Sequence, residues 1–131
     1  EYDYYTTTKG ILEKVKTHAG DVDFEVQPEL LSLFSNRDFG RYAGEKGEMN
    51  VCFISNNDIT GGNSGSAMFN ARGELLGLAF DGNWEAMSSD ILYEPKMQRC
   101  IGVDVRYILF MIEKYGKAGD LIRELKIVSG K

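Results

Sequence analysis

Histidine and cysteine, which most often hold zinc, are scarce in this sequence. The 131 residues contain one histidine, His18, and two cysteines, Cys52 and Cys100. Because structural zinc takes four Cys or His ligands, three such residues scattered this widely do not supply a zinc site. Two cysteines also exclude a dense disulfide framework. They leave two alternatives open, a single bridge or two buried free thiols.

Long hydrophobic runs and an excess of positive charge are missing too. The longest unbroken apolar stretch near the C-terminus covers only residues 107–112, far short of the ~20 residues of a membrane-spanning helix. The 20 acidic residues outnumber the 15 basic ones, which gives a net charge of −5. General nucleic-acid binding needs clustered positive charge. We therefore expect no membrane span and no nucleic-acid partner.

The composition is that of a folded domain. Hydrophobic residues make up 43% of the chain and charged residues 27%, which suits one core and argues against intrinsic disorder. The length fits one small domain or part of a larger one. Because the chain opens with Glu1 rather than Met and shows no signal-peptide pattern, we expect a fragment or a processed product.

Periodicity and turn residues predict three segments within residues 1–131. Residues 1–47 form an arm, a loop and a short helix: the β-rich start suggests a strand or an extended arm over residues 2–15, and Pro28 begins the helix. Residues 48–104 hold the strand candidates, at 49–54, 67–70, 74–80 and 99–103. Apolar residues spaced three and four apart predict a C-terminal helical region over 105–127. Phe69, Phe80 and Phe110 are expected in the core and Trp84 as a buried anchor.

The glycine-rich loop at residues 57–66 carries a serine in a setting suited to catalysis. The Ser64 hydroxyl is a poor nucleophile unless a base removes its proton and donors stabilise an oxyanion. Gly62 lies two residues earlier, so the N–H groups of Gly62 and Ser64 can point at one oxyanion. On spacing alone, a plain hairpin loop is the simpler interpretation. A phosphate-binding P-loop is excluded, because no Lys-Ser or Lys-Thr pair follows and the next element is a strand.

The motif at residues 60–66 (TGGNSGS) continues into a second one at 73–85 (GELLGLAFDGNWE). Together with residues 2–7, 98–99 and 103–107, these motifs resemble the bacterial dipeptidyl-peptidase 7 and 11 family of chymotrypsin-like serine exopeptidases. The resemblance implies a mostly β fold with helices. The chain would be the C-terminal half of a chymotrypsin-like double β-barrel, an antiparallel six-stranded barrel closed by a C-terminal α-helix. The rest of the parent chain, an N-terminal barrel with a helical insertion, would be its partner.

The implied activity is release of dipeptides from the free N-termini of oligopeptide substrates. By resemblance, Ser64 is the nucleophile and Gly62 supplies an oxyanion-hole N–H, while the catalytic His and Asp lie in the absent N-terminal portion. The chain alone is therefore expected to be inactive. His18 is expected to be an exposed structural residue, and Asp58 to form a turn. Such chemistry uses only side chains and backbone, so neither a metal nor a cofactor is implied.

Two residues after the loop bear on specificity. Gly82 occupies the position where, by resemblance, the residue shapes the pocket for the penultimate substrate residue. Arginine there accompanies acidic substrates, because a guanidinium pairs with a carboxylate. Gly82 therefore predicts a pocket for hydrophobic side chains, with a simple turn at residues 81–83 as the alternative. Asp81 is the expected counter-charge for the substrate's free α-amino group, with turn capping as its alternative.

The remaining expectations concern class, place and assembly. The alternative function is that of a non-catalytic trypsin-like domain for peptide binding or assembly. Such a domain has no need of an intact loop from Gly62 to Gly65, so the intact loop favours the enzyme. The family resemblance implies the periplasm or the cell surface of a Gram-negative bacterium. A missing partner barrel would expose apolar surface, so the isolated chain is expected to form a homodimer.

Overall fold

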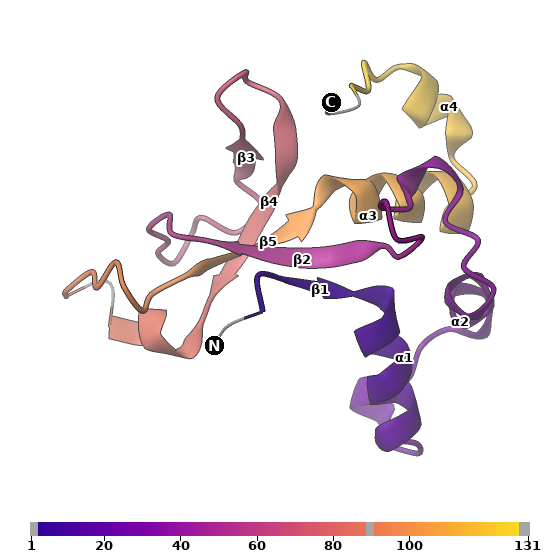
Figure 1. Cartoon of the computed structure of the whole chain (residues 1–131), viewed down its shortest axis with the longest axis horizontal. Helices are drawn as coiled ribbons and strands as arrows, with labels where there is room; N and C mark the ends of the chain where they lie inside the picture. The colour runs from indigo at the N-terminus through magenta and orange to yellow at the C-terminus, as the bar shows by residue number, and fades with distance from the viewer. Residues whose placement is uncertain (1–2, 89–90, 129–131) are drawn as a thin grey trace. The chain divides into compact units, whose positions relative to one another are not determined.

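The computed structural model describes residues 3–88 and 91–128, which form two compact units (Figure 1). Of the described residues, one unit contains those within 51–105 together with residues 3–5. The other contains residues 6–50 and 106–128. The candidate nucleophile Ser64 and both specificity residues belong to the first unit.

The strands form one antiparallel sheet, most of whose residues belong to the first unit. The strand order is β1 (Tyr5–Thr7), β2 (Asn50–Ser55), β5 (Cys100–Asp104), β4 (Leu75–Gly82) and β3 (Ala67–Phe69). The β2–β5, β5–β4 and β4–β3 pairs are antiparallel. The mostly β fold with helices and the four predicted strands are confirmed.

The predicted six-stranded barrel is not formed by this part of the chain. A barrel closes only when its first and last strands pair with each other. Within residues 3–88 and 91–128 the sheet has five strands, and β1 and β3 are its two open edges. Closure therefore needs strand pairing that these residues do not make.

The core of the first unit lies on one face of the sheet. Met68, Ala79 and Cys100 are buried there, and Phe53 and Ile59 pack against them. Successive residues of a strand point to opposite faces. For this reason Met68 takes the core position and its neighbour on β3 does not.

Three aromatic residues that were expected inside are exposed in this chain. The exposed fractions are 60% for Phe69, 43% for Phe80 and 81% for Trp84. Phe69 lies on the strand face opposite Met68, and Trp84 begins the short helix η3 (Trp84–Ser88). The prediction was wrong because it was based on residue type alone. In a strand, the alternation of side chains between the two faces decides which of them is covered. Phe110 is fully buried, as predicted.

Helices make up most of the second unit. The predicted arm over residues 2–15 is a strand only as far as Thr7 and then becomes the helix α1 (Thr8–Thr17). Ile11, Leu12 and Val15 follow helical spacing, which outweighs the β propensity of the preceding residues. The helix predicted after Pro28 is confirmed as α2 (Pro28–Ser35). Two further short helices, η1 (Val22–Phe24) and η2 (Gly40–Tyr42), lie in stretches for which no helix was predicted.

The C-terminal region is helical, as predicted, and is interrupted at residues 116–118; Gly116 lies in this interruption, whereas Gly119 begins the last helix. Helix α3 (Val105–Phe110) continues as a π-helical turn, η4 (Met111–Tyr115), and α4 (Gly119–Arg123) follows. The ring of Phe110 lies 6.0 Å from that of Phe34 and 6.0 Å from that of Phe39. These three rings form the buried centre of the second unit.

Both cysteines are free thiols, so the disulfide alternative does not hold. The register of β2 and β5 pairs Cys52 with Val103 and Cys100 with Ser55. Burial raises the pKa of the Cys100 thiol, which keeps it protonated at neutral pH. Within the described ranges, no helix is long and apolar enough to cross a membrane. The same residues contain no group of three or more His, Cys, Asp or Glu that could hold a metal.

Candidate active site

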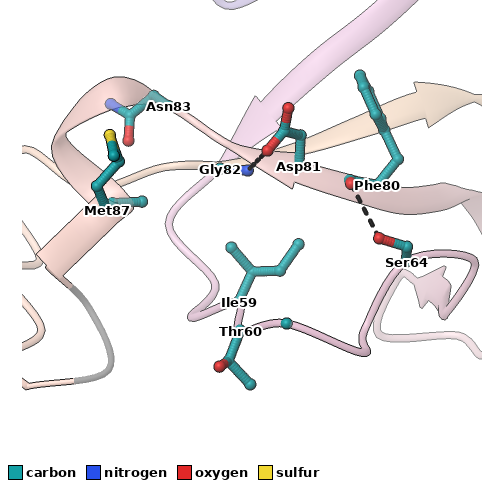
Figure 2. Close-up of a pocket in the computed structure, with 10 residues that line it drawn as sticks. Ile59, Thr60, Ser64, Phe80, Asp81, Gly82, Asn83 and Met87 are labelled. Atoms are coloured by element: carbon teal, nitrogen blue, oxygen red, sulfur yellow. Dashed lines mark hydrogen bonds between the residues drawn. The ribbon is translucent and has the colours of Figure 1, made fainter.

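A bulge in β4 shapes the site. Ala79 pairs with Gly102 on β5 and Asp81 pairs with Ile101, so Phe80 is an extra residue between them. A bulge of this kind bends the strand and redirects the groups of the inserted residue. Here the Phe80 carbonyl accepts a hydrogen bond from the Ser64 hydroxyl at 3.1 Å (Figure 2).

Ser64 lies where the glycine-rich loop joins the sheet. The Gly65 N–H donates to the Ala79 carbonyl at 2.7 Å, and the Ala79 N–H donates to the Ser66 carbonyl at 2.9 Å. These two bonds extend the β3–β4 ladder up to the residue after Ser64. The serine is therefore carried by the end of a hydrogen-bonded strand pair rather than by a free loop.

The turn before Ser64 leaves two backbone donors open. The Asn63 side-chain oxygen accepts from the Thr60 N–H at 3.0 Å, and the Asn63 N–H donates to the Thr60 carbonyl at 3.1 Å. Gly62 has a φ of +96°, a conformation that favours glycine. In the described part of the chain, no acceptor pairs with the N–H of Gly62 or of Ser64. Both N–H groups are available to an external acceptor.

Three of the four predicted site residues line one pocket. Ser64, Asp81 and Gly82 surround a volume of about 240 Å³ (Figure 2). Gly62 is not among the lining residues, although its neighbour Gly61 is. The rest of the lining is Ile59, Thr60, Phe80, Asn83, Ala86 and Met87.

Gly82 is a strand residue, and its conformation does not require glycine. It is the last residue of β4, pairs with Cys100 and has no positive φ. The turn alternative for Gly82 is therefore wrong. The restriction is one of space, because a Cβ at this position would lie 2.8 Å from the Cβ of Ala86 and 3.5 Å from the Cγ2 of Ile59.

Asp81 lines the pocket and also has a local partner. Its Oδ1 accepts a hydrogen bond from the Gly82 N–H at 2.8 Å (Figure 2). This bond is the capping contact that the alternative interpretation described. The side chain is exposed, so its carboxylate is also accessible from the pocket.

No general base is bonded to the Ser64 hydroxyl in the described part of the chain. Its hydrogen bond goes to a backbone carbonyl, which cannot take a proton at neutral pH. The His18 Nδ1 lies 2.9 Å from the Thr17 hydroxyl, and the ring stacks on Phe24 at 4.1 Å. His18 is exposed, as predicted. The Asp58 side chain accepts from the Ile59 N–H at 2.9 Å, as expected of a turn residue.

The sequence did not single out Asn83 and Ala86, which form one wall of the pocket. The Asn83 amide nitrogen donates to the Met97 carbonyl at 2.8 Å, and its side-chain oxygen accepts from the Arg99 N–H at 2.9 Å. The Asn83 carbonyl accepts from the Ala86 N–H at 2.9 Å and so begins η3. The one signal in the sequence near this wall was the turn-like motif at residues 81–83.

Comparison with known proteins decides the family. Residues 1–127 match the peptidase S46 family. The chain belongs to this family. It is 57% identical over 129 residues to dipeptidyl-peptidase 7 of Porphyromonas endodontalis, covering 98% of this chain and 15% of that protein. It is 47% identical over 127 residues to an Asp/Glu-specific dipeptidyl-peptidase of Capnocytophaga gingivalis, covering 97% and 18%.

The fold of this S46 chain is also that of solved structures. The crystal structure of Porphyromonas endodontalis DPP11 in complex with the dipeptide Arg-Glu superposes with a TM-score of 0.89 at 43% identity. The match covers 94% of this chain and 17% of the DPP11 chain. The predicted family is therefore confirmed. The chain spans less than a fifth of the length of these relatives.

Proposed function

We propose that the protein to which this S46 chain belongs is a serine-type dipeptidyl-peptidase, with Ser64 as its nucleophile. It releases dipeptides from the free N-termini of oligopeptides in the periplasm or at the cell surface of a Gram-negative bacterium. One observation carries the proposal: the Ser64 hydroxyl shares a pocket with Asp81 and Gly82. The relatives that match nearly all of this chain are named dipeptidyl-peptidases.

The open donors beside Ser64 suit acyl transfer. When Ser64 Oγ attacks a peptide carbonyl, the carbonyl oxygen becomes an oxyanion, and the N–H groups of Gly62 and Ser64 are free to donate to it. The base and its orienting acid, a His and an Asp, come from the rest of the protein. Proton transfer to that base would replace the hydrogen bond from Ser64 to the Phe80 carbonyl.

The outer edge of β4 offers a binding surface for an extended peptide. The ladder with β3 ends at Ala79, so Phe80–Gly82 has no strand partner on that side in the described residues. The Asn83 N–H points toward β5, where it bonds the Arg99 carbonyl, so the preceding Gly82 N–H points to the open edge. That N–H donates to the Asp81 carboxylate in this structure, so a substrate carbonyl that joins this edge by strand addition would take the place of that bond.

The pocket lining supports a hydrophobic penultimate residue. Ile59, Ala86 and Met87 contribute apolar groups, and Gly82 contributes no side chain. No lysine or arginine lines this pocket in the part of the chain that the structure describes. An acidic penultimate side chain would thus lose its hydration without gaining a counter-charge. We assign Asp81 to the substrate's α-amino group, because its exposed carboxylate is the one charged side chain of the described lining.

Dipeptide release by the full-length protein tests this function. The substrates are two peptides with free N-termini, one with Leu and one with Asp at the second position, and an N-acetylated Leu peptide. We expect release from the free Leu peptide alone. Ser64→Ala should abolish it, whereas the matched control Ser66→Ala, in the same loop, should retain most of it.

Each other outcome removes a defined part of the proposal. Release from the Asp peptide alone would refute the hydrophobic pocket and leave the peptidase. Cleavage of the acetylated peptide would refute the exopeptidase assignment. If no peptide is cleaved, the non-catalytic peptide-binding alternative becomes the better account.

A further inference from the structure

The space beside the Gly82 α-carbon is already filled by a neighbouring methyl group. A methyl group added to Gly82 would lie 2.8 Å from the Cβ of Ala86. Carbon atoms in contact normally lie about 3.5–4 Å apart. Two methyl groups therefore cannot occupy both positions unless the main chain moves. The pocket that Ser64 lines has room for a methyl group at position 82 or at position 86, but not at both.

The wall that carries Ala86 cannot yield by rotating a side chain. Alanine has no side-chain rotamers, so the main chain alone places its methyl group. The Ala86 N–H donates to the Asn83 carbonyl, and Asn83 is itself bonded to the backbone of Met97 and Arg99. These contacts tie the first turn of η3 to the segment leading into β5.

We propose that Ala86 is a specificity-determining residue that sets, jointly with Gly82, the size of penultimate side chain that the pocket accepts. The inference rests on the proposed function, since it concerns the same pocket. Its substrate class is peptides with an aliphatic residue of medium size at the second position. A larger side chain at position 86 should restrict the pocket to small residues, and glycine there should admit bulkier ones.

The first test changes position 86 in the full-length protein. The substrates are free N-terminal peptides with Ala, Leu or Phe at the second position. We expect Ala86→Val to lower kcat/KM for the Leu peptide relative to the Ala peptide by about tenfold or more. Ala86→Gly should shift the preference toward Phe. The control Ala71→Val, in the exposed turn between β3 and β4, should leave these ratios unchanged.

The second test measures the coupling between the two positions. Gly82→Ala alone should lower kcat/KM for the Leu peptide, and adding Ala86→Gly should restore it by about tenfold, because the competing methyl group is gone. Circular dichroism of each variant checks its folding. Ala86→Gly, which only removes atoms, reports on the pocket even if the larger substitutions disturb the fold.

Different outcomes overturn the proposed function and the role of Ala86. If the wild-type protein shows no Ser64-dependent release from any of the three peptides, the proposed function falls and this inference falls with it. If release depends on Ser64 but Ala86→Val leaves the Leu-to-Ala ratio unchanged, only this inference is overturned. Additive effects of the changes at positions 82 and 86 would overturn it as well.

Discussion

One inserted residue, Phe80, determines where the Ser64 hydroxyl is held. The register of β4 and β5 shifts around it, and its carbonyl becomes the hydrogen-bond acceptor for Ser64. The same bulge brings Asp81 and Gly82 into the pocket that Ser64 lines. The chemistry of the site thus depends on backbone groups as much as on side chains.

Substitution of two of the positive-φ glycines, Gly62 and Gly73, distinguishes a loss of catalysis from a loss of stability. They have φ values of +96° and +75°, and an added Cβ at either meets no atom within 4 Å. Each change to alanine should cost about 1–2 kcal/mol of local stability. In the full-length protein, Gly62→Ala should also lower kcat about 10²–10³-fold, because its N–H would leave the oxyanion site.

Steady-state kinetics on both variants checks this prediction. Gly73→Ala, in the hairpin turn, should keep its kcat. Equal losses of kcat in the two variants would mean that strain alone, and not the N–H of Gly62, accounts for the effect.

At the scale of elements, the sheet is shaped around the ring of Phe53. A Cβ at Gly102 would lie 2.6 Å from the Met68 sulfur and 2.9 Å from the Phe53 Cζ. A Cβ at Gly77 would lie 2.8 Å from the Phe53 Cε1 and 2.1 Å from the Val103 carbonyl oxygen. The two glycines let the ring lie against β5 and β4, the strands that carry the pocket.

Substituting these glycines should loosen the sheet to different degrees. Gly102→Ala should cost about 1–3 kcal/mol, because the Met68 thioether and the ring can partly shift. Gly77→Ala should cost more, because a backbone carbonyl cannot move aside. Amide hydrogen exchange of β4 and β5 in the full-length protein measures both effects.

A second substitution identifies the cause. Phe53→Leu should recover much of the loss in Gly102→Ala and little of it in Gly77→Ala. Gly10→Ala in α1, where an added Cβ meets nothing within 4 Å, is the matched control and should not destabilise. Equal rescue of both variants would show that the ring, rather than the Val103 carbonyl, limits position 77.

At the scale of the whole molecule, this chain matches only a small part of the length of its relatives. It spans about 15% of the length of the Porphyromonas endodontalis relative. Large apolar side chains, including Phe69 and Trp84, are exposed on it. The division into segments 1–47, 48–104 and 105–127 and the homodimer of the isolated chain stay predictions.

The isolated 131-residue chain should release no dipeptide from the free Leu peptide. Ser64 bonds a carbonyl here, and the proposed base and acid belong to the absent portion. A turnover assay on the purified chain, beside the full-length protein at equal concentration, checks this. Turnover by the chain that disappears in Ser64→Ala would contradict it.

Short-range patterns in the sequence predict much of this structure. β propensity and turn residues located the strands from β2 to β5, Pro28 located α2, helical spacing located α3, and the loop motif located Ser64. These features depend on residues that are close together in the chain, so they can be predicted from short sequence patterns. Helix α1 was missed because β-prone residues at its start masked the helical spacing behind them.

Contacts between residues far apart in the chain account for the rest. The bulge at Phe80 and the exposure of Phe69 have no signature in the sequence. Each depends on strand register and on which face of the sheet is covered. A shift of one residue in register reverses the facing of every side chain on a strand. For this reason the motif identified the nucleophile, whereas the shape of its pocket emerged only once the strands were paired.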